Sequence, residues 1–278
     1  MDLSIHNQIG ITSWANRPTR EVAGYMLHCI KPNSHILDVG CGMGKMTLDF
    51  AEDVPEGTVT GVDISASAID LARNTRDQRG VTNAQFFEGD ILKLPFADDT
   101  FDVVHCHQVL GQLRYNALEP GPVHGLREMR RVCKPGGFVC AREVEWASTI
   151  VHPLTEPLNN YINMYKRLSV RDGRDLAGGR GREFARRAGF DPDFITASAG
   201  LVTYEHPIDR QWWGDMTASR LEGTDDLKRA VWAIIVPEEA AKNMAAGWRD
   251  WAKSDDGFYS AMNGQIVCQK EILRSTEE

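Results

Sequence analysis

A short apolar run followed by glycine at every second position occupies residues 35–44 of this chain. The run ends at Asp38, and the glycines are Gly40, Gly42 and Gly44. Glycine permits a positive φ and leaves no Cβ between the backbone and a ligand. The pattern predicts a buried strand that stops at a tight turn and leads into a helix, whose free N–H groups then point toward whatever binds.

The spacing of these glycines distinguishes between two kinds of nucleotide cofactor. The dinucleotide fingerprint requires Gly-x-Gly-x-x-Gly, but Lys45 stands at its sixth position. Asp63 ends the next β-branched run, where a carboxylate can accept hydrogen bonds from both hydroxyls of a ribose. NAD enzymes share that acid, and a generic glycine-rich turn or a helix cap would use the same residues. Lys45 therefore disfavours a dinucleotide such as NAD, but these positions alone do not identify the cofactor.

Strand-like and helix-like segments alternate through the first half of the chain. The segments that read as strands are 35–39, 58–64, 84–87, 101–104 and 138–141, and Ser65 is positioned to cap one of the helices between them. This alternation predicts a parallel, doubly wound α/β sheet. Ligands of such sheets bind at the carboxyl ends of the strands.

The remaining segments follow a less regular rhythm. Pro18 and apolar residues spaced through Ile30 predict a helix that ends near Lys31. Beyond residue 145 the pattern predicts helices over 154–168, 182–188, around Trp212 and over 237–252, and strands over 195–204 and 259–269.

Composition narrows the partners of the chain. With 278 residues it can form one large domain with a cap or two modest domains, and its net charge of −8 does not favour a nucleic acid as partner. The six cysteines lack the spacing of a zinc site or a disulfide scaffold, so reduced thiols are expected. No segment resembles a signal peptide or a membrane span, and a cytoplasmic protein without membrane contact is the expectation.

Further signatures appear in order along the chain. Residues 89–91 read Gly-Asp-Ile, 94–96 Leu-Pro-Phe, 98–104 Asp-Asp-Thr-Phe-Asp-Val-Val and 134–137 Lys-Pro-Gly-Gly. Together with the glycine turn they resemble the class I S-adenosylmethionine (SAM) dependent methyltransferases of the ubiquinone/menaquinone-biosynthesis type (methyltransferase domain types 11 and 25). The resemblance is close over about residues 34–143. It implies a Rossmann-like, mostly parallel seven-stranded sheet with an antiparallel last strand and a helical cap.

The resemblance also implies that SAM is the cofactor. Asp38 would help to hold the methionine ammonium, Asp63 would bind the ribose, Ile64 would pack on the adenine and Asp90 would accept from the adenine amino group. The implied cofactor-binding residues are Asp38, Gly40, Cys41, Gly42, Gly44, Asp63, Ile64, Asp90, Ile91, His107, Gln108 and Arg17.

The sequence says less about the methyl acceptor and the catalytic residues than about the cofactor. His107 is the candidate catalytic residue, with Glu143, Glu145 and His152 as other candidate bases, and a hydrogen-bonded structural role is the alternative for His107. Related proteins often carry a histidine where this chain has Gly111 and Gln112, so a base at that point is absent. No metal site is expected, because His105 and His107 alone do not complete a ligand set. An apolar or aromatic acceptor would suit the aromatic residues beyond position 145, which include Trp146, Tyr161, Tyr165, Trp212 and Trp213.

The expected function is therefore SAM-dependent methylation of a small molecule, such as a secondary metabolite or another apolar or aromatic compound. The alternatives are a SAM-binding enzyme of the cyclase or lyase type that does not methylate, and a regulatory partner on the same fold. The expected organisation is a segment that closes over the site (1–33), a SAM-binding core (34–145), a substrate-binding cap (146–190) and the end of the sheet with further helices (191–278).

Overall fold

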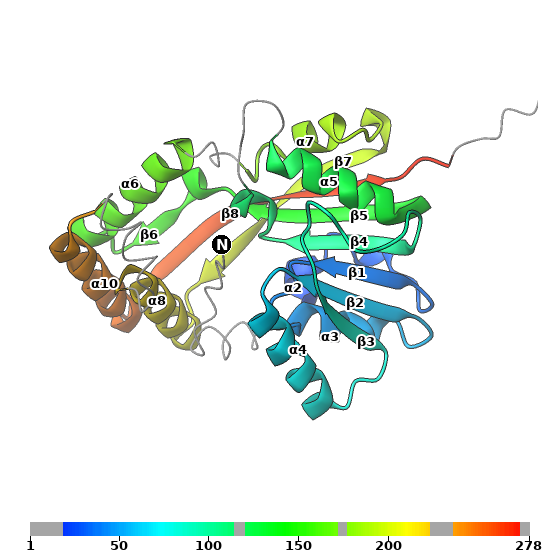
Figure 1. Ribbon diagram of the computed structural model, residues 1–278. Helices are drawn as coiled ribbons and strands as arrows, with labels where there is room; N and C mark the ends of the chain where they lie inside the picture. The colour runs from blue at the N-terminus through cyan, green and yellow to red at the C-terminus, as the bar shows by residue number, and fades with distance from the viewer. Residues whose placement is uncertain (1–18, 114–119, 172–176, 223–235, 273–278) are drawn as a thin grey trace, which may run out of the picture.

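The computed structural model describes residues 19–113, 120–171, 177–222 and 236–272, and a single twisted sheet runs through it (Figure 1). Its eight strands follow the order β3-β2-β1-β4-β5-β8-β6, and β7 pairs with β8. The strands are β1 (His35–Val39), β2 (Thr58–Asp63), β3 (Ala84–Glu88), β4 (Phe101–His107), β5 (Cys133–Val144), β6 (Ile150–His152), β7 (Ile195–Tyr204) and β8 (Phe258–Gln269). The helices are α2 (Thr19–Ala23), η1 (Leu27–Cys29), α3 (Lys45–Asp53), α4 (Ala66–Arg79), η2 (Leu110–Gln112), α5 (Gly121–Val132), η3 (Trp146–Ser148), α6 (Glu156–Arg171), α7 (Gly181–Arg187), η4 (Pro192–Phe194), α8 (Pro207–Glu222) and α10 (Glu238–Lys253).

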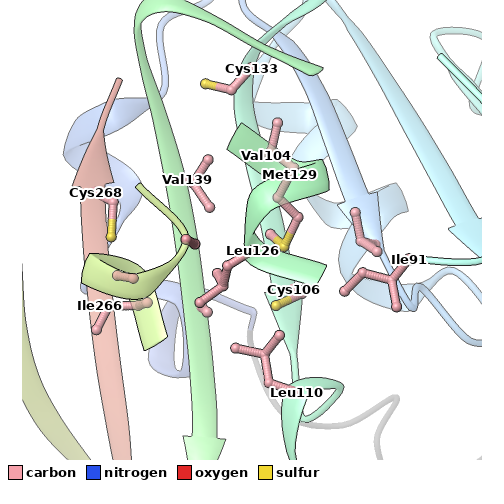
Figure 2. Close-up of a cluster of buried hydrophobic side chains, with 14 of the residues drawn as sticks. Ile91, Val104, Cys106, Leu110, Leu126, Met129, Cys133, Val139, Ile266 and Cys268 are labelled. Atoms are coloured by element: carbon pink, nitrogen blue, oxygen red, sulfur yellow. The ribbon is translucent and has the colours of Figure 1, made fainter. Parts of the chain in front are cut away.

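The five strands β3, β2, β1, β4 and β5 are parallel to one another. Their apolar runs are buried on both faces, as parallel strands covered by helices require. One face packs against α5 and α7 through the cluster drawn in Figure 2, where Leu126 and Met129 of α5 lie over Val104 of β4 and Val139 of β5. The other face packs against α2, α3 and α4. The predicted doubly wound α/β class is thus confirmed.

The last strand, β8, is antiparallel to β5, β6 and β7, which confirms the predicted reversal. β5 and β6 lie one after the other along a single edge of β8, because residues Val139–Val144 pair with one half of β8 and Ile150–His152 with the other. The β7–β8 pair therefore extends beyond the parallel core. Its far half carries a second apolar cluster formed with α6, α8 and α10, which we call the aromatic cap (Figure 1).

Two expectations need correction. Over the described residues the sheet has eight strands rather than seven, since the three-residue strand β6 is too short to give a periodic pattern. The predicted N-terminal helix is split into α2 and η1, and the interruption contains Gly24, a poor helix former. The predicted substrate-binding cap over residues 146–190 stays a prediction; in the structure its helix α6 packs with α8 and α10 around Trp248.

The helices of the described ranges were also compared with the requirements of a membrane span. None of them is long and apolar enough to cross a bilayer.

Candidate cofactor site

The glycine turn between β1 and α3 has the backbone that its sequence requires. Gly40, Gly42 and Gly44 all have positive φ, at 71°, 53° and 79°. A Cβ built on Gly40 would lie 2.3 Å from Cγ2 of Val109, in the loop after β4. The turn therefore lies directly against that neighbouring loop, and its glycines leave backbone rather than side chains at the ends of β1 and β4.

Asp38, at the end of β1, is held inside the protein rather than presented at the surface. Its side chain is 4% exposed. One carboxylate oxygen accepts a 2.6 Å hydrogen bond from the Thr47 hydroxyl of α3, and the other lies 2.8 Å from Nδ1 of His105 on β4. Asp38 thus links the strand, the helix after the turn and the adjacent strand. Sequence reasoning missed both partners, since Thr47 and His105 come together with Asp38 only through the fold.

Asp63, at the end of β2, faces the turn from the other side. Its carboxylate accepts hydrogen bonds from the backbone N–H of Gly42 at 2.9 Å and of Ser65 at 2.9 Å. Unlike Asp38 it is only partly buried. The Ser65 hydroxyl in turn caps α4 by accepting from the N–H of Ala68. The turn and the predicted ribose-binding acid are therefore one connected structure.

Two apolar side chains are exposed near this acid. Ile64 follows β2 and is 66% exposed, and Phe87 on β3 is 42% exposed. Exposed side chains of this size at the strand ends offer a surface on which a flat ring can pack. Ile64 was expected from the sequence, whereas Phe87 was not singled out there.

The Gly-Asp-Ile segment forms a tight turn after β3. One Asp90 oxygen accepts a 2.9 Å hydrogen bond from the N–H of Leu92. The Ile91 side chain is only 6% exposed and belongs to the core under α5. A Cβ on Gly89 would lie 2.7 Å from Val62 of β2, so the segment approaches β2 closely. Asp90 is thus placed at the same sheet edge as Asp63.

His107 and Gln108 stand where β4 ends. Gln108 has a positive φ of 56°, which is uncommon for a residue other than glycine, and its N–H donates to the carbonyl of Arg142 at 2.9 Å. Burial lowers the pKa of His107 well below its usual value, and the nearby Arg142 and His105 lower it further. His107 is therefore neutral at physiological pH, and the same surroundings oppose its taking up a proton.

Glu143 on β5 organises the loop that contains Gln108. Its Oε1 accepts a 2.7 Å hydrogen bond from the N–H of Leu110, and backbone N–H groups of Val109 and Gly111 also act on the carboxylate. Burial raises the pKa of Glu143 to about 7, and these three backbone donors limit the rise. A Cβ on Gly111 would lie 3.0 Å from Oε2 of Glu143, so the carboxyl group is closely fitted to this turn.

Glu143→Gln is expected to change how stability depends on pH. A carboxyl whose pKa is higher in the folded than in the unfolded protein holds extra protons when folded, so its contribution to stability falls as pH rises from about 4.5 to 7. A pKa that rises from 4.5 to about 7 corresponds to at most about 3–4 kcal/mol. Urea unfolding at pH 5 and pH 8 should show that loss in the wild type relative to the variant. Equal pH dependence of the two proteins would contradict the account.

The other predicted residues are placed as follows. Burial raises the pKa of the Cys41 thiol well above its usual value, with Asp38 and Asp63 adding to the effect, so the thiol stays protonated. Glu145 accepts from the N–H groups of Ala147 and Gly179. His152 lies on β6 in the cap, where its carbonyl accepts from Trp251. Arg17 lies outside the described residues. Within the described ranges no three His, Cys, Asp or Glu residues gather to hold a metal ion.

A mostly parallel sheet with a reversed last strand, whose strand ends carry a glycine turn hydrogen-bonded to Asp63, is the architecture of a class I SAM-dependent methyltransferase. A family model described as a methyltransferase domain matches residues 30–184, more than half of the chain. The chain belongs to this methyltransferase family, and SAM is its cofactor.

Relatives and solved structures agree with this assignment. An uncharacterized methyltransferase of Schizosaccharomyces pombe is 33% identical over 89% of this chain and 88% of its own length. A demethylmenaquinone methyltransferase of Bacillus cereus is 35% identical over 44% of this chain and 49% of its own, which confirms the predicted likeness to the menaquinone type.

Two solved structures share the fold. Phosphoethanolamine N-methyltransferase 2 of Haemonchus contortus, in complex with phosphomonomethylethanolamine and S-adenosylhomocysteine, has a TM-score of 0.58 at 16% identity and covers 97% of this chain and 60% of its own. The [4+2]-cyclase SpnF has a TM-score of 0.57 at 22% identity and covers 91% of this chain and 80% of its own. At these identities both show the fold alone.

Proposed function

We propose that this enzyme transfers the methyl group of SAM to a small apolar or aromatic molecule, such as a secondary metabolite. The observation that carries the proposal is the position of the aromatic cap, which continues the same sheet that presents the cofactor turn. Partly exposed Trp146 and Tyr165 stack there with ring centroids 4.9 Å apart. Flat apolar faces of this kind suit an aromatic acceptor.

The chain's own residues supply binding and alignment. Asp63 would accept from the ribose hydroxyls, Ile64 and Phe87 would pack on the adenine, and Asp90 would accept from its amino group. The turn at residues 40–44 would follow the methionine part, with Asp38 holding the turn in place from inside. SAM supplies an already activated sulfonium methyl, so alignment of the acceptor with the sulfur accounts for much of the catalysis.

His107 is proposed to line the methyl-transfer site together with Gln108. A role as general base agrees less well with its surroundings, because burial and Arg142 both disfavour its protonated form. Any proton that the methyl acceptor loses would therefore pass to water or to another group of the acceptor itself. His107 would line the site as a neutral hydrogen-bonding side chain. Arg17 is still proposed to pair with the SAM carboxylate.

A cytoplasmic location and a small-molecule partner are proposed from the cysteines and the net charge. All six cysteines are free, and five of them are buried, in keeping with a reducing compartment such as the cytoplasm. The net charge of −8 gives no general attraction for nucleic acid, so a small molecule is the proposed partner.

Incubation of the enzyme with methyl-labelled SAM and a library of natural products tests the proposal. We expect label in at least one apolar or aromatic compound, in step with formation of S-adenosylhomocysteine. Conversion of a compound without label, with SAM unchanged, would instead support the cyclase or lyase alternative. The wild type and Asp63→Ala should be run in parallel, since only the former is expected to transfer label.

A further inference from the structure

We propose that Arg220, at the core-facing end of α8, binds a carboxylate carried by the aromatic acceptor. This inference rests on the proposed function and names the chemical class of its acceptor. It also accounts for a buried polar feature of the cap that the cofactor site does not use.

Among the described residues, Arg220 forms no ion pair with an acid. Its Nε is shielded from solvent and makes no hydrogen bond with these residues. The nearest acid along α8, Glu222, pairs instead with Arg249 of α10 at 2.5 Å. The Arg220 side chain as a whole is partly exposed, so an anion can reach it.

The charge of Arg220 acts on two buried tyrosines of the cap. Burial raises the pKa of both Tyr161 and Tyr259 above the usual value, and the positive charge of Arg220 acts on both in the opposite direction. Tyr161 also contacts Tyr165, which stacks on Trp146. The aromatic stack and the positive charge of Arg220 therefore belong to the same cap.

The unpartnered polar atoms along this face of α8 can all donate. Trp213, Thr217 and Arg220 follow one another at helical spacing, and the indole N–H, the hydroxyl and the guanidinium Nε of these residues lack hydrogen-bond partners among the described residues. Trp213 and Thr217 are over nine-tenths buried. A carboxylate only accepts, and Arg binds it through a planar fork. The face is therefore complementary to an anion and unsuited to a cation.

The direction of the chain brings this end of the cap toward the cofactor. β7 runs from the core out into the cap, and α8 follows it back (Figure 1). Arg220 belongs to the last turn of α8. α6 likewise returns from β6 at the far end of the cap, with Tyr165 beyond its middle. An acceptor whose carboxylate lies on Arg220 would have its ring between the cap and the cofactor turn.

Two matched probes test the inference: 2-naphthoate, and its neutral methyl ester. Their binding to the enzyme saturated with S-adenosylhomocysteine would be followed by calorimetry and tryptophan fluorescence. We expect the wild type to bind 2-naphthoate at least tenfold more tightly than the ester. Arg220→Met should abolish that preference, Arg220→Lys should keep part of it, and Lys242→Met, which removes an exposed cation of α10, should leave it intact.

Equal affinity of the wild type for the acid and the ester would overturn the proposal without any variant, so it remains testable even if Arg220→Met fails to fold. A preference that survives in folded Arg220→Met would also overturn it. The proposed function is judged separately, by binding of S-adenosylhomocysteine in the same titration. Loss of that binding in the wild type would refute the function itself, whereas intact cofactor binding without a preference for the acid would refute only the role of Arg220.

Discussion

Replacing Asp63 with alanine is expected to weaken SAM binding by about 100-fold while the protein stays folded. The carboxylate already accepts from the N–H of Gly42 and of Ser65, and it is partly exposed at the strand end. Each hydrogen bond from a ribose hydroxyl to a charged acceptor contributes about 1.5 kcal/mol or more, so two of them correspond to about two powers of ten in affinity. Calorimetric titration with SAM measures the effect.

The matched control is Asp70→Ala. Asp70 lies on α4, its side chain is 72% exposed, and it pairs only with the neighbouring Arg73 in the described structure. Its loss should leave SAM affinity unchanged. An unchanged affinity in folded Asp63→Ala would remove Asp63 from the cofactor site.

Asp38→Ala, unlike Asp63→Ala, is expected to act mainly on stability, lowering the free energy of unfolding by about 3 kcal/mol or more. The substitution would leave Thr47 and His105, both essentially without solvent exposure, lacking the oxygen atoms that they contact. Each buried group left unsatisfied costs about 1–3 kcal/mol. Urea unfolding monitored by tryptophan fluorescence measures the loss.

Thr47→Val supplies the comparison for Asp38→Ala. It removes only one of the two contacts and keeps the shape of the side chain, so a loss of about 1 kcal/mol is expected. If Asp38→Ala unfolded at the same urea concentration as the wild type, the buried linkage of β1, α3 and β4 would contribute nothing to stability.

The sequence allowed the prediction of most elements because their signals are local. The β-branched run before Asp63 and the apolar run before Asp38 need no tertiary context to be read as buried strands, and Ser65 caps α4 as its position suggested. β6 could not be predicted, since three residues contain no usable period and their pairing with β8 is set by the fold. At Gly24 the sequence has a helical period, but the helix is interrupted there and a 3-10 turn follows.

The candidate site was partly predictable for the same reason. The two acids of the motif look alike in sequence, and only the fold separates them: Asp38 is enclosed by Thr47 and His105, whereas Asp63 faces the turn. Glu143 was one of several candidate bases, but its hydrogen bond to the loop after β4 depends on the pairing of β4 with β5. Arg220 had no sequence signal, because an unpaired arginine on a helix cannot be told from one at the surface.

Hydrogen exchange measured by mass spectrometry, with and without S-adenosylhomocysteine, tests the location of the cofactor most directly. The account predicts slower exchange when the ligand is bound in peptides that cover residues 40–46, 63–68 and 107–113, and no change in peptides from α10. Protection confined to other segments, or unchanged exchange at residues 40–46 under saturating ligand, would contradict the placement of SAM at the glycine turn.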